Sequence, residues 1–494
     1  MKKYIIGRLI RSVVSIMAVV SIAMILIFCL MDRNDIFEKD GTLTKLGGKP
    51  DESIAYKYSR WEELGYLEYA NQAEMCRNES DNYDVCMMID SEESLKVKEI
   101  YESKGYTVTK FKSGMIWAAR DFTPFELIFN FYKNLIKIDS PSFVNDELNP
   151  NLDRGIYFGT DHNGIPAIKC SGCENQYLLY VNTKFPFIHQ NFIKLNFGVS
   201  FPTHSGLETL DVINSGQGKL NQKEVVYETG LKEKSAVNLH ACKYKLTSTL
   251  DRMDKQRFET NYADCAKNYE DASMVGTSYI FGILSLILAY CIAIPSGITM
   301  AQKKDKWQDK LGLIYINFMI SVPSLAFIYF FERVGSSMGF PNKFPIYGAG
   351  DVRSYVLPVV ILGLMSTAGT MTWLRRYMVD QSNSDYVKFA RAKGLTQKEI
   401  FSRHILKNAI IPIVNGIPSS IVLCISGAVI TETVFAIPGM GKMLPDAINA
   451  HNNTMIITLT FIFTALSIFS LLAGDILMSL VDPRIQLSSK GETR

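Results

Sequence analysis

The clearest chemical pattern in the sequence is a basic segment at residues 385–412, which lies between two apolar runs. Gly394 permits a sharp helix end, and Thr396 with Glu399 forms a capping box for a second helix. The segment therefore predicts a basic, amphipathic helix–turn–helix. Such a helix either docks into a groove of another protein or only sets topology and lies on anionic lipid. In the docking interpretation, the contact residues are Asp385, Tyr386, Ala390, Arg391, Ala392, Lys393 and Gly394.

Small and basic side chains alternate in the first of these two helices. Ala390 and Ala392 leave room for close approach by another protein, and Arg391 and Lys393 can pair with acidic groups on it. Any energy source must come from such a partner, because the sequence has no nucleotide-binding P-loop. Motifs of zinc peptidases, EF-hands and serine hydrolases are also absent. We therefore expect no catalytic residue, no metal and no cofactor in this chain.

Several apolar runs are long enough to cross a bilayer as helices. The six runs cover roughly residues 9–30, 274–301, 311–331, 355–374, 409–435 and 455–480. For the first run a cleaved signal peptide is the alternative, but the run ends at Ile27-Phe28-Cys29 instead of small residues. Polar residues within the later runs either bond between helices or line a passage for substrate. They include Thr370, Ser419 and Ser420, and the residues predicted for the passage are Asn317, Ser321, Ser324, Thr367 and Asn415.

The distribution of charge orients these runs. The connection 302–310 carries four lysines and the connection 375–408 carries eight Lys or Arg residues, whereas 437–454 holds only Lys442. By the positive-inside rule, both termini and the basic connections are expected in the cytoplasm. The block 32–271 has a net charge of −8, against +11 for the rest of the chain, and is expected outside the cell.

The outside block is long enough to fold around a core of its own. Residues 92–104 have a helical pattern, and residues 106–112 are typical of a strand. Residues 156–169 read as a β-hairpin with Asn163-Gly164 at its turn. We therefore expect an α+β domain here.

Six cysteines lie in this block, and an even number on the oxidising side of a membrane indicates disulfides. Because loop-closure entropy favours near neighbours, the expected pairs are Cys76–Cys86, Cys170–Cys173 and Cys242–Cys265. The alternative is a zinc site that combines Cys170 and Cys173 with His240 and Cys242.

The basic segment resembles the coupling loop of binding-protein-dependent ABC importers, in the version found in oligopeptide and dipeptide permease subunits. The general importer motif begins Glu-Ala-Ala, and Lys388 and Phe389 replace its first two residues. Further stretches that resemble the family are Leu195–Ser200, Ile294–Gly297, Ser321–Ser324, Arg375, Glu432–Leu444, Asp475 and Asp482–Ile485.

This resemblance implies an architecture: an all-α polytopic membrane bundle of six transmembrane helices, the type I ABC importer fold, with a large α+β extracellular insertion. The expected parts are the first transmembrane helix at 1–31, the extracellular domain at 32–272, the permease core at 273–484 and a cytoplasmic tail at 485–494. Within the core, the coupling loop is expected at 377–408.

The resemblance also implies a function, ATP-driven import of oligopeptides into the cytoplasm across the cell membrane. The implied partners are a second permease subunit, two cytoplasmic ATPases that bind ATP and Mg²⁺, and a lipid-anchored extracellular peptide-binding protein. Peptide and membrane lipid complete the set, and nucleic acid is not expected.

Other features leave more than one interpretation open. Glu432, Pro438, Gly439 and Gly441 form either an external gate or ordinary groups at the membrane interface. Asp475 is expected to pair with a cation or cap a helix. The extracellular block either docks the binding protein or only shields the pathway. A membrane receptor or an ion channel is the other class of function, but six spans and a coupling loop argue against the first, and we find no selectivity filter for the second.

Overall fold

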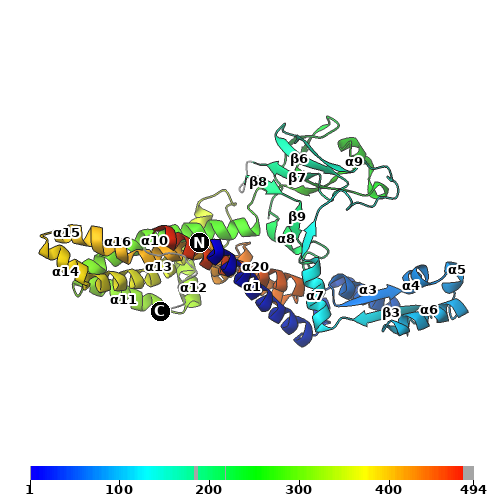
Figure 1. Ribbon diagram of the computed structural model, residues 1–494, viewed down its shortest axis with the longest axis horizontal. Coiled ribbons are helices and arrows are strands. Elements are labelled where there is room, and N and C mark those ends of the chain that lie inside the picture. The colour runs from blue at the N-terminus through cyan, green and yellow to red at the C-terminus, as the bar shows by residue number, and fades with distance from the viewer. Residues whose placement is uncertain (1, 183–186, 217, 482–494) are drawn as a thin grey trace. The chain divides into compact units, whose positions relative to one another are not determined.

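The computed structural model describes residues 2–182, 187–216 and 218–481 and divides the chain into two compact units, shown as ribbons in Figure 1. The helical unit comprises Met1–Ala23, Ala272–Asn449 and Ile456–Arg494. The mixed unit, which contains helices and sheets, comprises Met24–Asp271 and Ala450–Met455. The predicted tail 485–494 and the stretch Asp482–Ile485 lie outside the described residues.

The helical unit is built from long apolar helices. Two of its long helices, α10 (Met274–Gln302) and α13 (Arg353–Ser382), pack along one another (Figure 1). Five stretches of the described chain are long and apolar enough to span a membrane: Ile5–Leu30 in α1 (Lys2–Leu30), α10, α13, Ile411–Phe435 in α17 (Ile411–Gly427) and α18 (Val429–Phe435), and Asn453–Leu480 in α20 (Asn453–Val481).

The third predicted span is not one straight helix. It consists of α11 (Trp307–Ser321) and α12 (Ser324–Ser337), which are bent by 105° at a short break. The cause is Pro323, because proline lacks an N–H and disfavours helical backbone at the residue before it. Val322 accordingly has extended backbone, with φ −78° and ψ 125°. The expected six spans are reached only when this bent pair counts as one.

Close packing in the helical unit depends on apolar and small side chains. Phe281 of α10, Ile361 of α13 and Phe435 of α18 are buried in one cluster. Where α10 meets α17, a Cβ on Gly282 would lie 2.4 Å from the Cβ of Cys424. Glycine is therefore required at this crossing, as is common where membrane helices approach closely.

The N-terminal part of the mixed unit has a small antiparallel sheet of order β1-β3-β2, from β1 (Leu67–Asn71), β2 (Thr107–Lys110) and β3 (Ile116–Asp121). Val97 and Tyr101 of α6 (Glu92–Ser103) share its buried core with the disulfide Cys76–Cys86. The predicted helix and strand in this stretch are confirmed. The other helical elements are η1 (Asp35–Phe37), α2 (Gly41–Lys45), α3 (Pro50–Glu63), α4 (Gln72–Glu79), α5 (Tyr83–Cys86) and α7 (Pro124–Asn134).

The later part of the mixed unit contains a four-stranded antiparallel sheet of β5 (Gly155–Thr160), β6 (Pro166–Ser171), β7 (Tyr177–Val181) and β8 (Ile188–Gln190). The predicted hairpin is confirmed, because β5 and β6 pair from Gly155↔Ser171 to Thr160↔Pro166. The two-stranded pairs are β4 (Ile136–Ile138) with β9 (Ile193–Leu195), β10 (Lys223–Val226) with β11 (Lys232–Ser235), and β12 (Val237–Lys243) with β13 (Asp264–Lys267). The short helices are α8 (Thr209–Asn214), η2 (Thr247–Thr249) and α9 (Arg252–Arg257).

Two disulfides belong to this later part, Cys170–Cys173 and Cys242–Cys265. With Cys76–Cys86, all three pairs are those that loop-closure entropy predicts. The alternative zinc site is ruled out in this structure because the sulfurs of Cys170, Cys173 and Cys242 are bonded to other sulfurs.

The mixed unit also includes a segment far from the rest of it in sequence, Ala450–Met455. The side-chain amide of Asn452 donates to Ser200 Oγ and Thr203 Oγ1, both at 2.8 Å, and that of Asn453 donates to the hydroxyl of Tyr66 at 2.6 Å. Both asparagines are buried. These bonds could not be predicted from the sequence, because each joins residues more than 200 positions apart.

Candidate functional site

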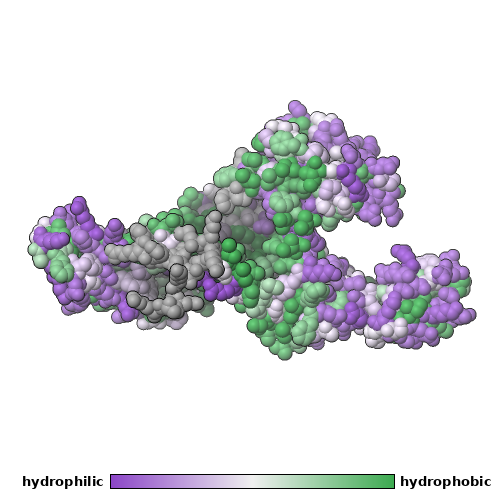
Figure 2. All heavy atoms as spheres, in the orientation of Figure 1, coloured by the Kyte–Doolittle hydropathy of each residue, from purple (hydrophilic) through white to green (hydrophobic). Residues whose placement is uncertain are grey.

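The predicted docking segment forms a short helical hairpin at one end of the helical unit. Its elements are α14 (Asp385–Ala392), α15 (Gln397–Glu399), the π-helical turn η3 (Ile400–Ile405) and α16 (Leu406–Ala409). Val387 and Ala390 of α14 are buried in one apolar cluster with Leu374 and Met378 of α13. In Figure 2, mainly hydrophilic residues gather over the end of the unit that carries α14 and α15.

The structure separates the predicted contact residues into a buried and an exposed set. Ala390 is only 5% exposed, and its side chain packs against the chain's own core. Arg391, Ala392, Lys393 and Gly394 are exposed. Phe389, which we did not predict, lies just before them and is 70% exposed. An exposed aromatic ring among basic groups is the signal that could have identified it.

The first two predicted residues are placed differently. Asp385 is exposed and forms an ion pair with Lys388 at 2.8 Å, so both side chains lie on the surface of α14. The hydroxyl of Tyr386 donates to Gln381 Oε1 at 2.7 Å, which joins α14 to the end of α13. Tyr386 therefore positions the helix. Helix α13 itself continues to Ser382, into the predicted loop 377–408.

The turn between α14 and α15 has the local structure that its residues predict. Gly394 has φ +81°, a conformation that favours glycine, and its N–H donates to the carbonyl of Arg391 at 3.0 Å. Thr396 and Glu399 form the capping box, with the Glu399 carboxylate accepting from the Thr396 hydroxyl at 2.7 Å. These bonds from Thr396 lower the pKa of Glu399.

A buried ion pair supports this end of the helical unit. The guanidinium of Arg375 on α13 binds both carboxylate oxygens of Asp309 on α11, at 2.6 and 2.7 Å. The side chain of Asp309 is 1% exposed, and its Oδ2 also accepts the backbone N–H of Asp305. Bidentate pairing fixes both distance and orientation, so α11 and α13 are held in one register ten residues before α14.

The predicted gate residues meet around a buried carboxylate. Glu432 of α18 is fully buried, and its Oε1 accepts the hydroxyl of Ser278 on α10 at 2.6 Å. Its Oε2 accepts the N–H of Lys442 at 2.8 Å, in the first turn of α19 (Met440–Asn449). An anionic carboxylate at a helix N-terminus is favourable because free N–H groups point toward it. Glu432 thus ties α10, α18 and α19 together.

The neighbouring residues of this carboxylate leave little space. A Cβ on Gly439 would lie 2.4–2.5 Å from three atoms of the Glu432 carboxylate, so this position requires glycine. Gly441 is buried in the first turn of α19, and Pro438 is half-buried just before it. The hydroxyl of Ser278 completes the arrangement by accepting the N–H of Met440 at 2.8 Å.

A cavity of about 240 Å³ lies between α10, α13 and α17. Its polar lining residues are Ser285, Tyr290, Ser366, Thr370 and Ser420, among apolar ones such as Leu286 and Leu423. Two of the polar span residues noted in the sequence, Thr370 and Ser420, therefore line it. The five residues predicted for the passage are not in its lining.

Those five residues do not lie together. Thr367 is fully buried and bonds to the hydroxyl of Tyr315 at 2.6 Å, which serves helix packing. Asn317 and Ser321 are exposed on α11, and Ser324 begins α12. Asn415 of α17 has a buried side-chain oxygen without a hydrogen-bond partner among the described residues.

The structure identifies the cation that pairs with Asp475. Asp475 of α20 forms an ion pair with Arg8 of α1 at 2.9 Å, and both side chains are partly exposed. The expectation of a pairing cation is confirmed. The sequence could not identify Arg8 because it lies 467 positions away, at the other end of the chain.

The comparisons with known proteins place the chain among membrane permeases. Residues 293–487 match the family described as "Binding-protein-dependent transport system inner membrane component". The oligopeptide transport system permease protein AmiC of Streptococcus pneumoniae serotype 4 is 43% identical over 500 residues, 99% of this chain and 100% of AmiC. The dipeptide transport system permease protein DppB of Lactococcus lactis subsp. cremoris is 31% identical over 44% of this chain and 71% of DppB.

Among solved structures, the inward-facing MetNI methionine ABC transporter aligns with 42% of this chain and 94% of its own, at 15% identity and a TM-score of 0.35. The matches to sequence relatives define an inner-membrane permease component of a binding-protein-dependent transporter, with the type I importer membrane fold. Within that class, the chain belongs to the family of oligopeptide ABC transporter permease subunits and is a multi-pass membrane protein. Because AmiC is matched along its whole length, the mixed unit is shared with it.

Proposed function

We propose that this chain is one of two paired permease subunits of an importer that moves oligopeptides into the cytoplasm, driven by two partner ATPases. Those ATPases bind ATP and Mg²⁺, and a lipid-anchored binding protein delivers the peptide from outside. In this proposal both termini and α14 lie in the cytoplasm, the bent pair α11–α12 counts as the third of six spans, and residues 32–272 form an extracellular insertion. The supporting observations are the family membership and the charge asymmetry of the connections.

The observation that carries the coupling role is the mounting of α14. Val387 and Ala390 are fixed in the core of the helical unit, while Phe389 and Arg391 of the same helix, and Lys393 just past its end, are exposed. A helix that is packed on one side and exposed on the other can transmit the movement of a bound protein without unfolding. We therefore assign α14 as the helix that an ATPase contacts.

Charge reversal separates docking from the simpler topological role. Reversing Arg391 and Lys393 to Glu removes exposed charges and no core contact, so the protein should still fold and insert. Peptide uptake should fall at least tenfold, and ATP hydrolysis should no longer respond to peptide. The matched control reverses Lys303 and Lys306, two exposed lysines of another basic connection. If both pairs have equal effects, the basic residues only set topology or bind lipid.

Gly394 offers a second test of the same segment. A Cβ there would meet no atom within 4 Å, but φ +81° disfavours any residue with a Cβ by about 1 kcal/mol. Gly394→Val should therefore redirect the exposed turn with little loss of global stability. We expect normal membrane insertion with loss of uptake, and unchanged uptake would contradict the assignment.

We further propose that Glu432 and the Pro438–Gly441 turn form part of the external gate. The support is that one carboxylate holds three helices through Ser278 and the backbone of Lys442, so that its bonds form or break as a set. The passage would include the cavity between α10, α13 and α17, and we retain Asn317, Ser321, Ser324, Thr367 and Asn415 as candidates for its other polar positions.

For the insertion we propose a docking surface for the peptide-binding protein. The support is an exposed aromatic pair on α7, Phe125 at 86% and Phe129 at 67%, because exposed aromatic side chains are typical of interfaces. Replacing both with Ser should weaken association with the binding protein in pull-down from membranes. Unchanged association would favour a simple shielding cap.

A further inference from the structure

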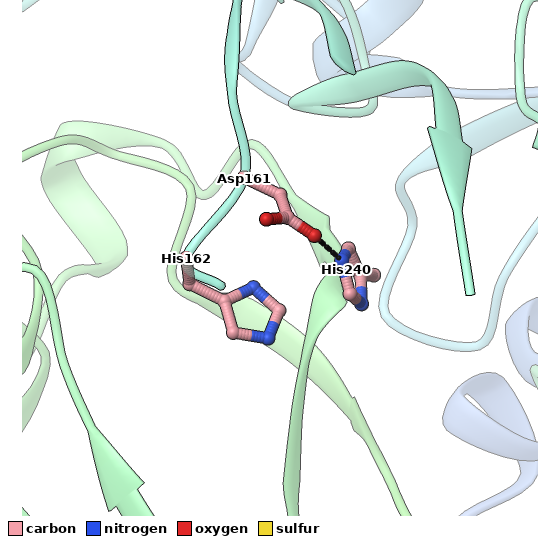
Figure 3. A group of neighbouring side chains, drawn as sticks. All are labelled: Asp161, His162 and His240. Atoms are coloured by element: carbon pink, nitrogen blue, oxygen red, sulfur yellow. Dashed lines mark hydrogen bonds and ion pairs between the residues drawn. The ribbon is translucent and has the colours of Figure 1, made fainter. Parts of the chain in front are cut away.

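A cluster of three metal-ligating side chains lies in the mixed unit, apart from the segments considered above. Asp161 and His162 occupy the turn between β5 and β6, and His240 lies on β12 (Figure 3). One ligand atom from each residue lies within 4.8 Å of the other two. The sequence does not bring these side chains together, because His162 and His240 are 78 positions apart.

The carboxylate of Asp161 is held in a fixed orientation. Its Oδ1 accepts the backbone N–H groups of Asn163 and Ile165, both at 2.8 Å. This leaves Oδ2 directed at His240 Nε2, 2.7 Å away, as the dashed line in Figure 3 marks. Such outer hydrogen bonds to a ligating carboxylate orient it before the metal arrives.

The two imidazole rings are also placed by their surroundings. The ring of His240 stacks on Tyr180, with centroids 4.6 Å apart and an interplanar angle of 6°. The centroids of the His162 and His240 rings are 4.2 Å apart. Two residues along β12, the disulfide Cys242–Cys265 joins this strand to β13. The frame behind the cluster is therefore rigid.

Burial divides the cluster in a way that suits a bound ion. The side chains of Asp161 and His240 are 1% and 7% exposed, whereas His162 is exposed. Two ligands are thus withdrawn from solvent, and the third can turn inward to close the site. Zinc takes four ligands, and water from the solvent side would be the fourth.

From this geometry we propose that Asp161, His162 and His240 bind one divalent zinc ion. Two imidazoles and a carboxylate suit Zn²⁺, whereas Ca²⁺ and Mg²⁺ prefer oxygen ligands alone. With Zn–N and Zn–O bonds of about 2.0–2.1 Å, tetrahedral ligand atoms lie about 3.3 Å apart. The Asp161–His240 contact of 2.7 Å needs to open only slightly to admit the ion.

The experiment uses the full chain in lipid nanodiscs, purified without a histidine tag and stripped with a chelator. Zinc is titrated against a chromophoric competitor, and retained metal is counted by mass spectrometry. We expect one zinc per chain. His162→Ala should weaken binding at least tenfold, because it removes one of three protein ligands. Asp161→Asn should do the same while it keeps the oxygen that accepts the turn N–H groups.

His189→Ala is the matched control. His189 stacks on Tyr180 with centroids 5.1 Å apart, in the same sheet, but is not part of the cluster. Loading with Cu²⁺ adds a direct readout, because electron paramagnetic resonance should show two nitrogen ligands in the parent chain and one in His162→Ala. The proposal is overturned if no zinc is retained, or if zinc binding in the His162 and Asp161 variants equals that of the parent. The cluster is then a structural Asp–His hydrogen bond. His240→Ala is omitted as a test because His240 is buried and its loss can disturb folding.

Discussion

The contact between Gly439 and the Glu432 carboxylate makes a quantitative prediction for Gly439→Ala. The added Cβ would lie 2.4–2.5 Å from the carboxylate atoms, whereas non-bonded heavy atoms settle at about 3.5 Å. The carboxylate must therefore shift by about 1 Å. Its bonds from Ser278 at 2.6 Å and from the N–H of Lys442 at 2.8 Å would then exceed hydrogen-bond length.

Losing two buried hydrogen bonds costs about 2–6 kcal/mol, and relaxation of the backbone lowers this toward about 3 kcal/mol. We expect Gly439→Ala to reduce the free energy of unfolding by that amount, measured by denaturant titration in mixed micelles. Gly369→Ala is the control, because a Cβ at this position of α13 meets no atom within 4 Å. It should be neutral or slightly stabilising, since alanine has the higher helix propensity.

A double-mutant cycle isolates the clash from other effects of the substitution. In a Glu432→Ala background the obstructing carboxylate is gone, so Gly439→Ala should cost less than about 1 kcal/mol. Glu432→Asp, which retracts the carboxylate by one methylene, provides a second background if the first fails to fold. Equal costs of Gly439→Ala in all backgrounds would refute the reasoning.

Three further perturbations have expected outcomes. Asp309→Asn should lower the free energy of unfolding by about 3 kcal/mol, because it leaves the mostly buried guanidinium of Arg375 without its counter-charge. Opening the Cys76–Cys86 disulfide by substitution with Ser should cost about 2–3 kcal/mol, measured by thermal unfolding. Hydrogen bonds from Arg120 and from Thr123, the cap of α7, lower the pKa of Glu126 to about 2. Acidification should therefore weaken the start of α7, which hydrogen exchange would measure.

The sign of the pH effect follows from the lowered pKa. Stability from Glu126 is present above its unfolded pKa of about 4.3 and is lost as the pH falls toward 2. Glu126→Gln should remove this pH dependence of exchange in α7, and its persistence would assign it to other groups. For the Asp309–Arg375 ion pair, replacing Asp309 with Leu and Arg375 with Met should recover most of the free energy of unfolding that Asp309→Asn loses. For the disulfide, the stability difference between the parent protein and the Ser variant should disappear once both are fully reduced.

Features set by neighbouring residues could be predicted from the sequence. The capping box of Thr396 and Glu399, the hairpin at Asn163-Gly164 and the three disulfides all depend on residues that are close along the chain. Their geometry follows from turn preferences and loop-closure entropy. The resemblance to the family also pointed to Glu432, but its hydrogen-bond donors, the hydroxyl of Ser278 and the backbone N–H of Lys442, were not predicted.

Features that join distant residues could not be predicted in this way. The partners of Asp309 and Asp475 lie 66 and 467 positions away, and charge alone does not choose among many arginines. The burial of Ala390 could not be predicted for a similar reason, because a small residue suits both a partner's surface and the chain's own core. The break at Pro323 was visible, but proline is tolerated within membrane helices, so the 105° bend did not follow.

The segment Ala450–Met455 has a consequence for how the two units can be separated. The mixed unit is long and mostly contiguous, and by sequence it resembles a cassette that could be cut out between residues 31 and 273. Removing it would, however, also remove Ser200, Thr203 and Tyr66, which accept the side-chain hydrogen bonds of Asn452 and Asn453. The segment Ala450–Met455 would then remain without the rest of its unit. A shortened permease therefore needs changes at Asn452 and Asn453 as well as the deletion. The reason is that the segment Ala450–Met455 belongs to the same compact unit as the residues that would be removed.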